Sequence, residues 1–110
     1  MNDGLISSRY ATALMNFAIK NGEEKKVYSE MAILYQIFKM VKNLQQSITS
    51  AVVPKLRKKE ILVTAVGGKT SNSLDKFFDL IIDNKRESKL QSIAYRYTEI
   101  YRSQNNIHLG

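Results

Sequence analysis

The sequence predicts an all-α domain, a compact bundle of about six helices of which two are short. Glycine and proline are sparse, at five and one of 110 residues, so few positions end a helix. Apolar residues recur three and four positions apart through most of the chain, which is the period of one helix face. No segment shows sustained two-residue alternation bounded by turn residues, so nothing indicates a half-buried strand.

The first helix is expected over residues 5–21, with Ser7 or Ser8 placed to cap its start and Gly22 placed to end it. When the helix is wound at roughly 100° per residue, its polar residues gather on one stripe roughly 120° wide. The rest of its surface is apolar, whereas the apolar arc of an ordinary surface helix is often about 100° wide. This helix is therefore either central in the bundle or covered by something that the chain does not supply. The polar stripe consists of Ser8, Arg9, Thr12, Asn16 and Lys20.

The second helix is expected over residues 23–41, because its apolar residues recur at alternating spacings of four and three. Glutamates in its first turn and lysines near its last turn match the helix dipole. A brief third helix is expected over residues 43–50, to which Leu44 and Ile48 give an apolar side. The stripe of the second helix consists of Val27, Met31, Leu34, Phe38 and Val41.

The remaining three helices are bounded by proline, glycine and serine. Pro54 starts the fourth helix, since the first turn has no use for the N–H that proline lacks, and the glycines at 67 and 68 end it. Ser71 or Ser73 caps the fifth helix, which ends near residue 84. The last helix begins near residue 87, and its apolar side consists of Leu90, Ile93, Ala94, Tyr97, Ile100 and Tyr101.

The composition indicates one soluble intracellular domain, assigned to residues 1–105. The chain contains no cysteine, which excludes disulfides and thiolate metal sites. It contains no apolar run of about 18 residues, the length that a membrane-spanning helix requires. Its acidic N-terminus lacks the basic-then-apolar order of a signal peptide.

The net charge of +7 indicates an acidic partner, a membrane surface or nucleic acid. Residues 1–54 carry six Lys/Arg against four Asp/Glu, and residues 55–110 carry eleven against six, so the excess lies in the second half. Two short clusters, at 55–59 and 85–89, dominate this excess. Each is interrupted by a leucine or an acid, as is usual at helix ends and on solvated faces.

The search for catalytic residues finds no candidate, and neither a metal nor a cofactor is expected. The single histidine, His108, lies in a terminal tail expected to fray, so it is interpreted as incidental. With no cysteine, Cys/His nucleophiles and ordinary zinc sites cannot be assembled. Asp75, Asp79 and Asp83 recur every four residues, but they lie on the polar side of their helix. Pairing with Lys76 and Lys85 is expected to make this a solvated face.

Nucleic-acid binding is the alternative that the charge leaves open. An RNA-binding platform requires exposed aromatic residues interleaved with Arg or Lys. Tyr28, Tyr35 and Tyr95 are the tyrosines expected to point outward, and the sequence scatters them rather than grouping them. A basic all-helical nucleic-acid-binding domain therefore stands as the second hypothesis.

Three segments together resemble the delta subunit of bacterial rotary ATP synthases, whose mitochondrial counterpart is the oligomycin-sensitivity-conferring protein. Residues 9–14, with Phe17 and Ala18, resemble the opening Arg-x-Tyr-Ala-x-Ala-Leu/Phe signature, here without the proline often found between the arginine and the tyrosine. Residues 53–62 resemble the short proline-started helix with a central lysine. Residues 77–93 are similar to the family's apolar run, Asn-x-Arg turn and resumed helix, which is the most specific of the three matches.

The resemblance covers the N-terminal domain of the family and implies a six-helix bundle that caps the catalytic head. It implies that a groove between the first and fifth helices holds the N-terminal helix of an alpha subunit. The groove would be formed by Tyr10, Ala13, Leu14, Phe17, Lys76, Phe77 and Leu80. Residues 106–110 would begin a linker to a missing C-terminal domain, through which the family contacts the b subunits of the peripheral stalk.

By the same resemblance, the expected function is that of a non-catalytic stator component in the proton-translocating ATP synthase. The complex would place it peripherally on the cytoplasmic side of the bacterial inner membrane. An uncovered apolar groove also favours weak self-association of a fragment. The partners expected are thus the alpha-subunit helix and a second copy of the chain, with no nucleic acid.

Overall fold

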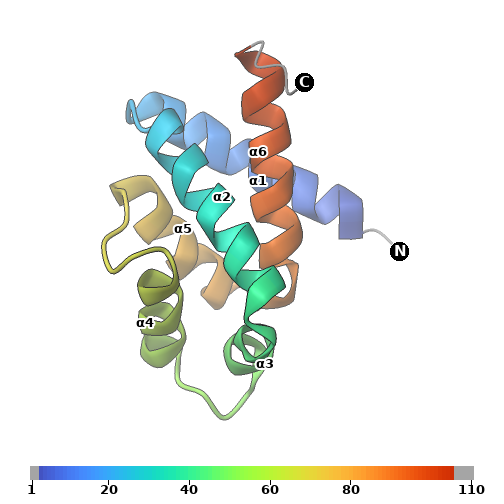
Figure 1. Cartoon of the computed structure of the whole chain (residues 1–110), viewed down its shortest axis with the longest axis vertical. Helices are drawn as coiled ribbons and strands as arrows, with labels where there is room; N and C mark the ends of the chain where they lie inside the picture. Colours follow the sequence, from blue (N-terminus) through green and yellow to red (C-terminus); the bar gives the residue numbers. More distant parts are fainter. Residues whose placement is uncertain (1–2, 106–110) are drawn as a thin grey trace.

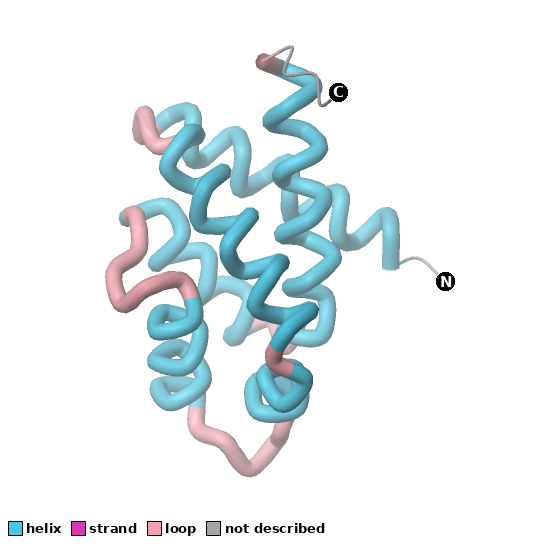
Figure 2. Tube along the Cα trace, viewed as in Figure 1, coloured by secondary structure: helices cyan, strands magenta, loops and turns pink. Residues whose placement is uncertain are grey.

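The computed structural model describes residues 3–105, and these residues form a helical bundle without strands (Figure 1). The predicted all-α class and the six helices are confirmed, and loops are confined to short connections between them (Figure 2). The helices are α1 Asp3–Lys20, α2 Glu24–Met40, α3 Lys42–Thr49, α4 Lys55–Ala65, α5 Asn72–Asp83 and α6 Leu90–Gln104, with a single 3-10 turn, η1 Glu87–Lys89, before α6.

The start of α1 differs from the prediction, because the helix begins at Asp3 and neither predicted serine caps it. Ser7 is only 1% exposed inside the helix, and the Ser8 hydroxyl accepts a hydrogen bond of 3.0 Å from Arg96 Nε on α6. Both serines serve tertiary packing rather than the helix end. The predicted stop at Gly22 is confirmed: its φ of 69° lets the amides of residues 22 and 23 reach carbonyls in the last turn of α1.

The start of α5 is capped by Ser71, whose hydroxyl accepts a hydrogen bond of 3.1 Å from the Leu74 amide. Ser73, the other predicted cap, instead donates hydrogen bonds to the carboxylate of Glu23, which immediately precedes α2. Pro54 precedes α4 in extended conformation, with φ −64° and ψ 155°, and its carbonyl accepts from the Lys58 amide. Pro54 and Ser71 therefore mark the starts of α4 and α5 to within one residue.

The core lies where α6 packs against both α1 and α2, with α5 closing the side behind them (Figure 1). Tyr97 at the centre is fully buried, and its hydroxyl donates a hydrogen bond of 2.8 Å to the Glu24 carbonyl. Burial raises the pKa of Tyr97 far above its usual range. The largest other fully buried side chains are Phe78, Leu14, Met15, Met31, Leu34, Ile48, Leu62, Leu74, Ile81, Leu90 and Ile93.

Candidate helix-binding groove

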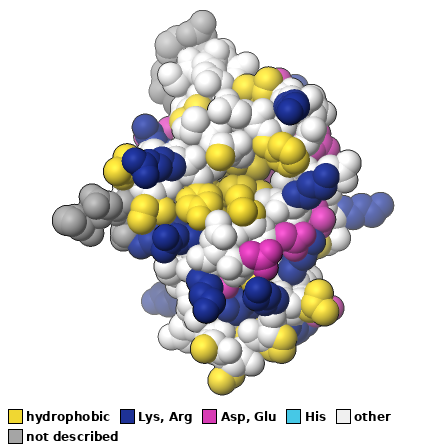
Figure 3. All heavy atoms as spheres, turned by 180° about the vertical axis from the view of Figure 1, so that it is seen from behind, with side chains coloured by type: hydrophobic (Ala, Val, Ile, Leu, Met, Phe, Trp, Pro, Cys, Tyr) yellow, Lys and Arg dark blue, Asp and Glu magenta, His cyan; other side chains and the backbone are white. Residues whose placement is uncertain are grey.

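The α1 and α5 helices pack side by side, and a hollow of about 230 Å³ lies between them. The view from behind shows a band of apolar side chains across this side of the molecule, with charged residues along its edges (Figure 3). The hollow is lined by Ala13, Leu14, Phe17, Lys76, Phe77 and Leu80. Six of the seven residues predicted for the groove are thus brought to one place.

The lining divides into a buried floor and accessible walls. Leu14 and Phe77 are 1% and 4% exposed, so they belong to the core, and only a small part of each side chain reaches the floor of the hollow. Leu80 is 44% exposed, Ala13 is exposed and Phe17 is half-buried. The wide apolar surface of α1 therefore divides into two parts: one side packs into the bundle, and the other side is open to solvent.

Tyr10, the seventh predicted residue, does not line the hollow. Its ring meets Phe77 edge-on, with centroids 6.3 Å apart and planes at 72°. Its hydroxyl accepts a hydrogen bond of 3.0 Å from Asn84 Nδ2 at the end of α5. Tyr10 therefore holds α1 against α5 and fixes the ring that forms the floor.

The carboxylates of α5 pair with α4, so the predicted pairing with Lys76 and Lys85 is wrong. Lys59 Nζ lies 3.2 Å from Asp75 and 3.0 Å from Asp79, while Lys55 Nζ lies 3.1 Å from Asp83. Burial by itself would lower the pKa of Lys59, but its hydrogen bonds to the two aspartates outweigh this and raise it. The prediction considered only neighbours on the same helix, whereas the packing of α4 against α5 brings cations from outside it.

Two glutamates of the α2 region hold the N-terminus of α5, and sequence reasoning missed both. Glu30, which is 6% exposed, accepts hydrogen bonds of 2.7 Å from both the amide and the hydroxyl of Ser71. Glu23 accepts from the Ser73 hydroxyl at 2.6 Å and amide at 2.9 Å, and these bonds lower the pKa of its carboxyl. The sequence does hold one signal for Glu30, because this charged residue lies on the same helix face as the apolar residues Val27 and Met31 and therefore needs a buried partner. These bonds fix where α5 lies, and hence where its groove residues lie.

A second buried link joins α4 to the turn before α6. Lys58 Nζ lies 2.9 Å from Glu87 Oε2, with side chains only 11% and 8% exposed. Both residues fall within the basic clusters that were interpreted as solvated surface, so that interpretation is wrong for Lys58. Within residues 3–105 no group of His, Asp and Glu is arranged to hold a metal ion.

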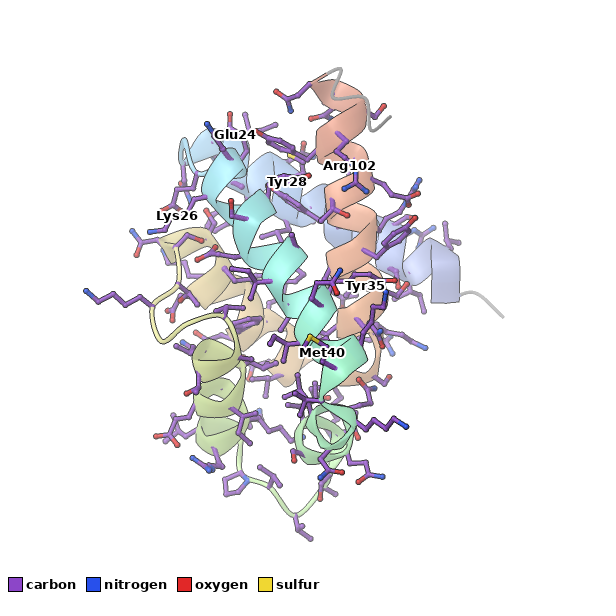
Figure 4. The ribbon with its side chains drawn as sticks, viewed as in Figure 1. Glu24, Lys26, Tyr28, Tyr35, Met40 and Arg102 are labelled. Carbon is purple, nitrogen blue, oxygen red and sulfur yellow. The ribbon has the colours of Figure 1, made fainter. Side chains whose placement is uncertain are left out.

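The tyrosines interpreted as scattered are in fact paired by the packing of α2 against α6. Tyr28 stacks on Tyr101 with centroids 4.3 Å apart, and Tyr35 meets Tyr95 at 5.2 Å. Tyr28 and Tyr35 lie along the same side of α2, with Arg102 beside Tyr28 (Figure 4). The rings therefore contact one another across α2 and α6, while Tyr95 remains 42% exposed and Lys39 Nζ lies 5.3 Å from the centroid of the Tyr35 ring.

The fold and the hollow together define a class: a small helical-bundle domain with an open apolar groove between two of its helices. Comparison with known families gives the particular one. The family model described as ATP synthase delta (OSCP) subunit matches residues 6–109, and the chain belongs to this family. The resemblance drawn from the three segments is thereby confirmed.

Curated relatives agree with this assignment. The chain is 38% identical over 108 residues to the ATP synthase subunit delta of Phocaeicola vulgatus, covering 97% of this chain and 58% of the relative. It is 35% identical to that of Parabacteroides distasonis, covering 97% and 59%, and 33% identical to that of Bacteroides fragilis, covering 100% and 60%. The chain therefore spans less than two thirds of the length of these relatives. No solved structure matches it.

Membership of the family bears on the remaining expectations. The family is that of a subunit of the ATP synthase complex, which agrees with the expected role as a structural component rather than a catalyst. None of the helices within residues 3–105 is long and apolar enough to cross a membrane. His108 and the linker predicted over residues 106–110 lie outside the described residues.

Proposed function

We propose that this domain is a non-catalytic stator element that binds the N-terminal helix of an ATP synthase alpha subunit in the groove between α1 and α5. The observation that carries the proposal is the open apolar hollow, in which Leu80 and Ala13 remain accessible although the surrounding surface is polar. Membership of the delta-subunit family supports the proposal, because the ATP synthase complex would provide a partner to fill the groove. The domain would then join the catalytic head to the peripheral stalk.

The dimensions of the hollow favour a helix over a small molecule. Its volume of about 230 Å³ is below the range of roughly 300–1,000 Å³ typical of ligand pockets, and it is bordered by two helices rather than enclosed. An amphipathic helix needs only a shallow apolar strip that receives the side chains of one face. Ala13 suits this use, because its small side chain lets a partner helix approach closely.

A stator must resist torque, so the walls of its groove must be stiff. The bonds from Glu30 and Glu23 to the N-terminus of α5, and the bond between Tyr10 and Asn84 at its other end, hold α5 at both ends. These contacts supply rigidity without reactive groups. Contact with the b subunits of the stalk is proposed for the part of the relatives that this chain does not cover.

The proposal is tested with a peptide that copies the alpha-subunit N-terminal helix. The peptide is expected to bind the wild-type domain, and Ala13→Asp is expected to abolish binding, because a larger, charged side chain would stand where the partner helix must approach closely. Since Ala13 is exposed in the free domain, the circular dichroism spectrum and melting curve should stay close to wild type.

The matched control is Ala51→Asp, the same substitution at an exposed position of the α3–α4 connection. This variant should bind the peptide as the wild-type domain does. Isothermal titration calorimetry gives the dissociation constant of the peptide for both variants and for the wild-type domain. Failure of the wild-type domain to bind the peptide would refute the proposed function.

A further inference from the structure

The groove is surrounded by cations that have no anionic partner. Lys76 lines the hollow itself, and Arg9 lines a shallow depression that adjoins it and shares Ala13 with it. Lys20 lies two turns beyond Ala13 along the same side of α1. All three side chains are exposed, and none makes an ion pair within the part of the chain that the structure describes.

The carboxylates nearest the groove do not balance these cations. Asp75 and Asp79 both pair with Lys59, and Asp83 pairs with Lys55, so each faces α4 rather than the groove. The two lysines of α4 thereby hold these carboxylates toward α4 and offset two of their three charges. Lys76 and Arg9 place an unpaired positive charge on each wall of the hollow.

We infer that the helix docked in this groove carries Asp or Glu residues beside its apolar face, and that Lys76 and Arg9 select for them. The inference rests on the proposed function and specifies the partner's chemistry. Charges at the edge of an interface steer association and exclude wrong partners more than they add affinity. A helix with lysines flanking its apolar face would meet like charges on both walls, so it is disfavoured.

The test uses three peptides built on the alpha-subunit N-terminal helix. Their apolar positions are kept, and the polar positions flanking the apolar face are all Glu, all Gln or all Lys. Dissociation constants are measured with the wild-type domain at about 50 and about 300 mM salt, where screening lengths differ more than twofold. We expect the Glu peptide to bind tightest and the Lys peptide weakest, with about two- to fivefold between successive peptides at low salt and less at high salt.

Charge reversal on the domain provides the second arm. Lys76→Glu and Arg9→Glu are each expected to narrow the difference in dissociation constant between the Glu and Lys peptides, and the double variant is expected to reverse their order. Both residues are exposed, so neither change should affect folding. Lys42→Glu is the matched control, because it alters the net charge equally at an exposed position on α3, which does not border the groove.

The outcomes separate the two proposals. If the native peptide binds and Ala13→Asp abolishes binding, but the three peptides bind equally and Lys76→Glu changes nothing, the inference is overturned and the proposed function stands. The same holds if Lys42→Glu has as large an effect as Lys76→Glu, because net charge alone would then explain it. If the native peptide does not bind at all, both proposals fail.

Discussion

Glu30 shows how one buried residue positions a site it does not touch. Its carboxylate accepts two hydrogen bonds of 2.7 Å from Ser71, and Ser71 in turn caps α5 by accepting from the Leu74 amide. The chain of contacts runs from α2 through the cap to the helix that carries Phe77 and Leu80. A charged group at 6% exposure is tolerated here because both of its oxygens are hydrogen-bonded.

Glu30→Ala is expected to lower the free energy of unfolding by about 1–3 kcal/mol, because it leaves the Ser71 amide and hydroxyl buried without their acceptor. Glu30→Gln keeps one acceptor oxygen and should cost less. Urea titration followed by circular dichroism measures both variants. Equal stability of the alanine variant and the wild-type domain would show that these hydrogen bonds contribute nothing net.

At the scale of elements, α4 is held by charge on two sides. Lys55 and Lys59 reach the aspartates of α5, while Lys58 forms a buried ion pair with Glu87 before α6. Exposed pairs contribute little to stability, at about 0–1 kcal/mol each. The buried pair matters in a different way, since removing one partner leaves the other charged and desolvated.

Lys58→Met is therefore expected to destabilise the domain by about 3–5 kcal/mol, because Glu87 would stay buried without its cation. The double variant Lys58→Met/Glu87→Gln should recover most of that loss. Denaturant unfolding of the two single variants and the double variant completes a mutant cycle. A double variant no more stable than Lys58→Met would mean that the lysine acts through packing rather than charge.

At the scale of the whole molecule, the bundle leaves the apolar strip between α1 and α5 uncovered. The core is closed by α6 packing on α1 and α2, yet the outer side of α1 and Leu80 on α5 remain exposed beside it. In the ATP synthase we propose that the alpha-subunit helix covers this strip. Alone in solution, the domain offers the same surface to a second copy of itself.

We expect the isolated domain to self-associate weakly through the groove. Sedimentation velocity should show a coefficient that rises with protein concentration for the wild-type domain but not for Leu80→Asp, which places a charge in the strip. Adding the alpha-subunit peptide should abolish the concentration dependence, because peptide and second copy would compete. A coefficient independent of concentration would contradict the expectation.

Ala13, Phe77 and Leu80 line one hollow, as the resemblance to the family implies, but no local pattern predicts what surrounds them. The partners of the α5 aspartates were misassigned to the same helix, although the lysines that pair with them stand 16 to 28 residues earlier in the chain. Tyr28 and Tyr101 likewise meet across 73 positions of sequence.

The amino-acid sequence is enough to predict the all-α class, the order and approximate ends of the helices, the excess of apolar surface on α1 and the family. It is enough because helical period, caps and short motifs depend on residues within a few positions of one another. The packing of the helices sets which side of α1 is open, that Glu30 holds the cap of α5, and that two α4 lysines pair with the aspartates beside the groove. These features depend on contacts between distant segments, such as Glu30 and Ser71, which are 41 positions apart, and no local pattern encodes them.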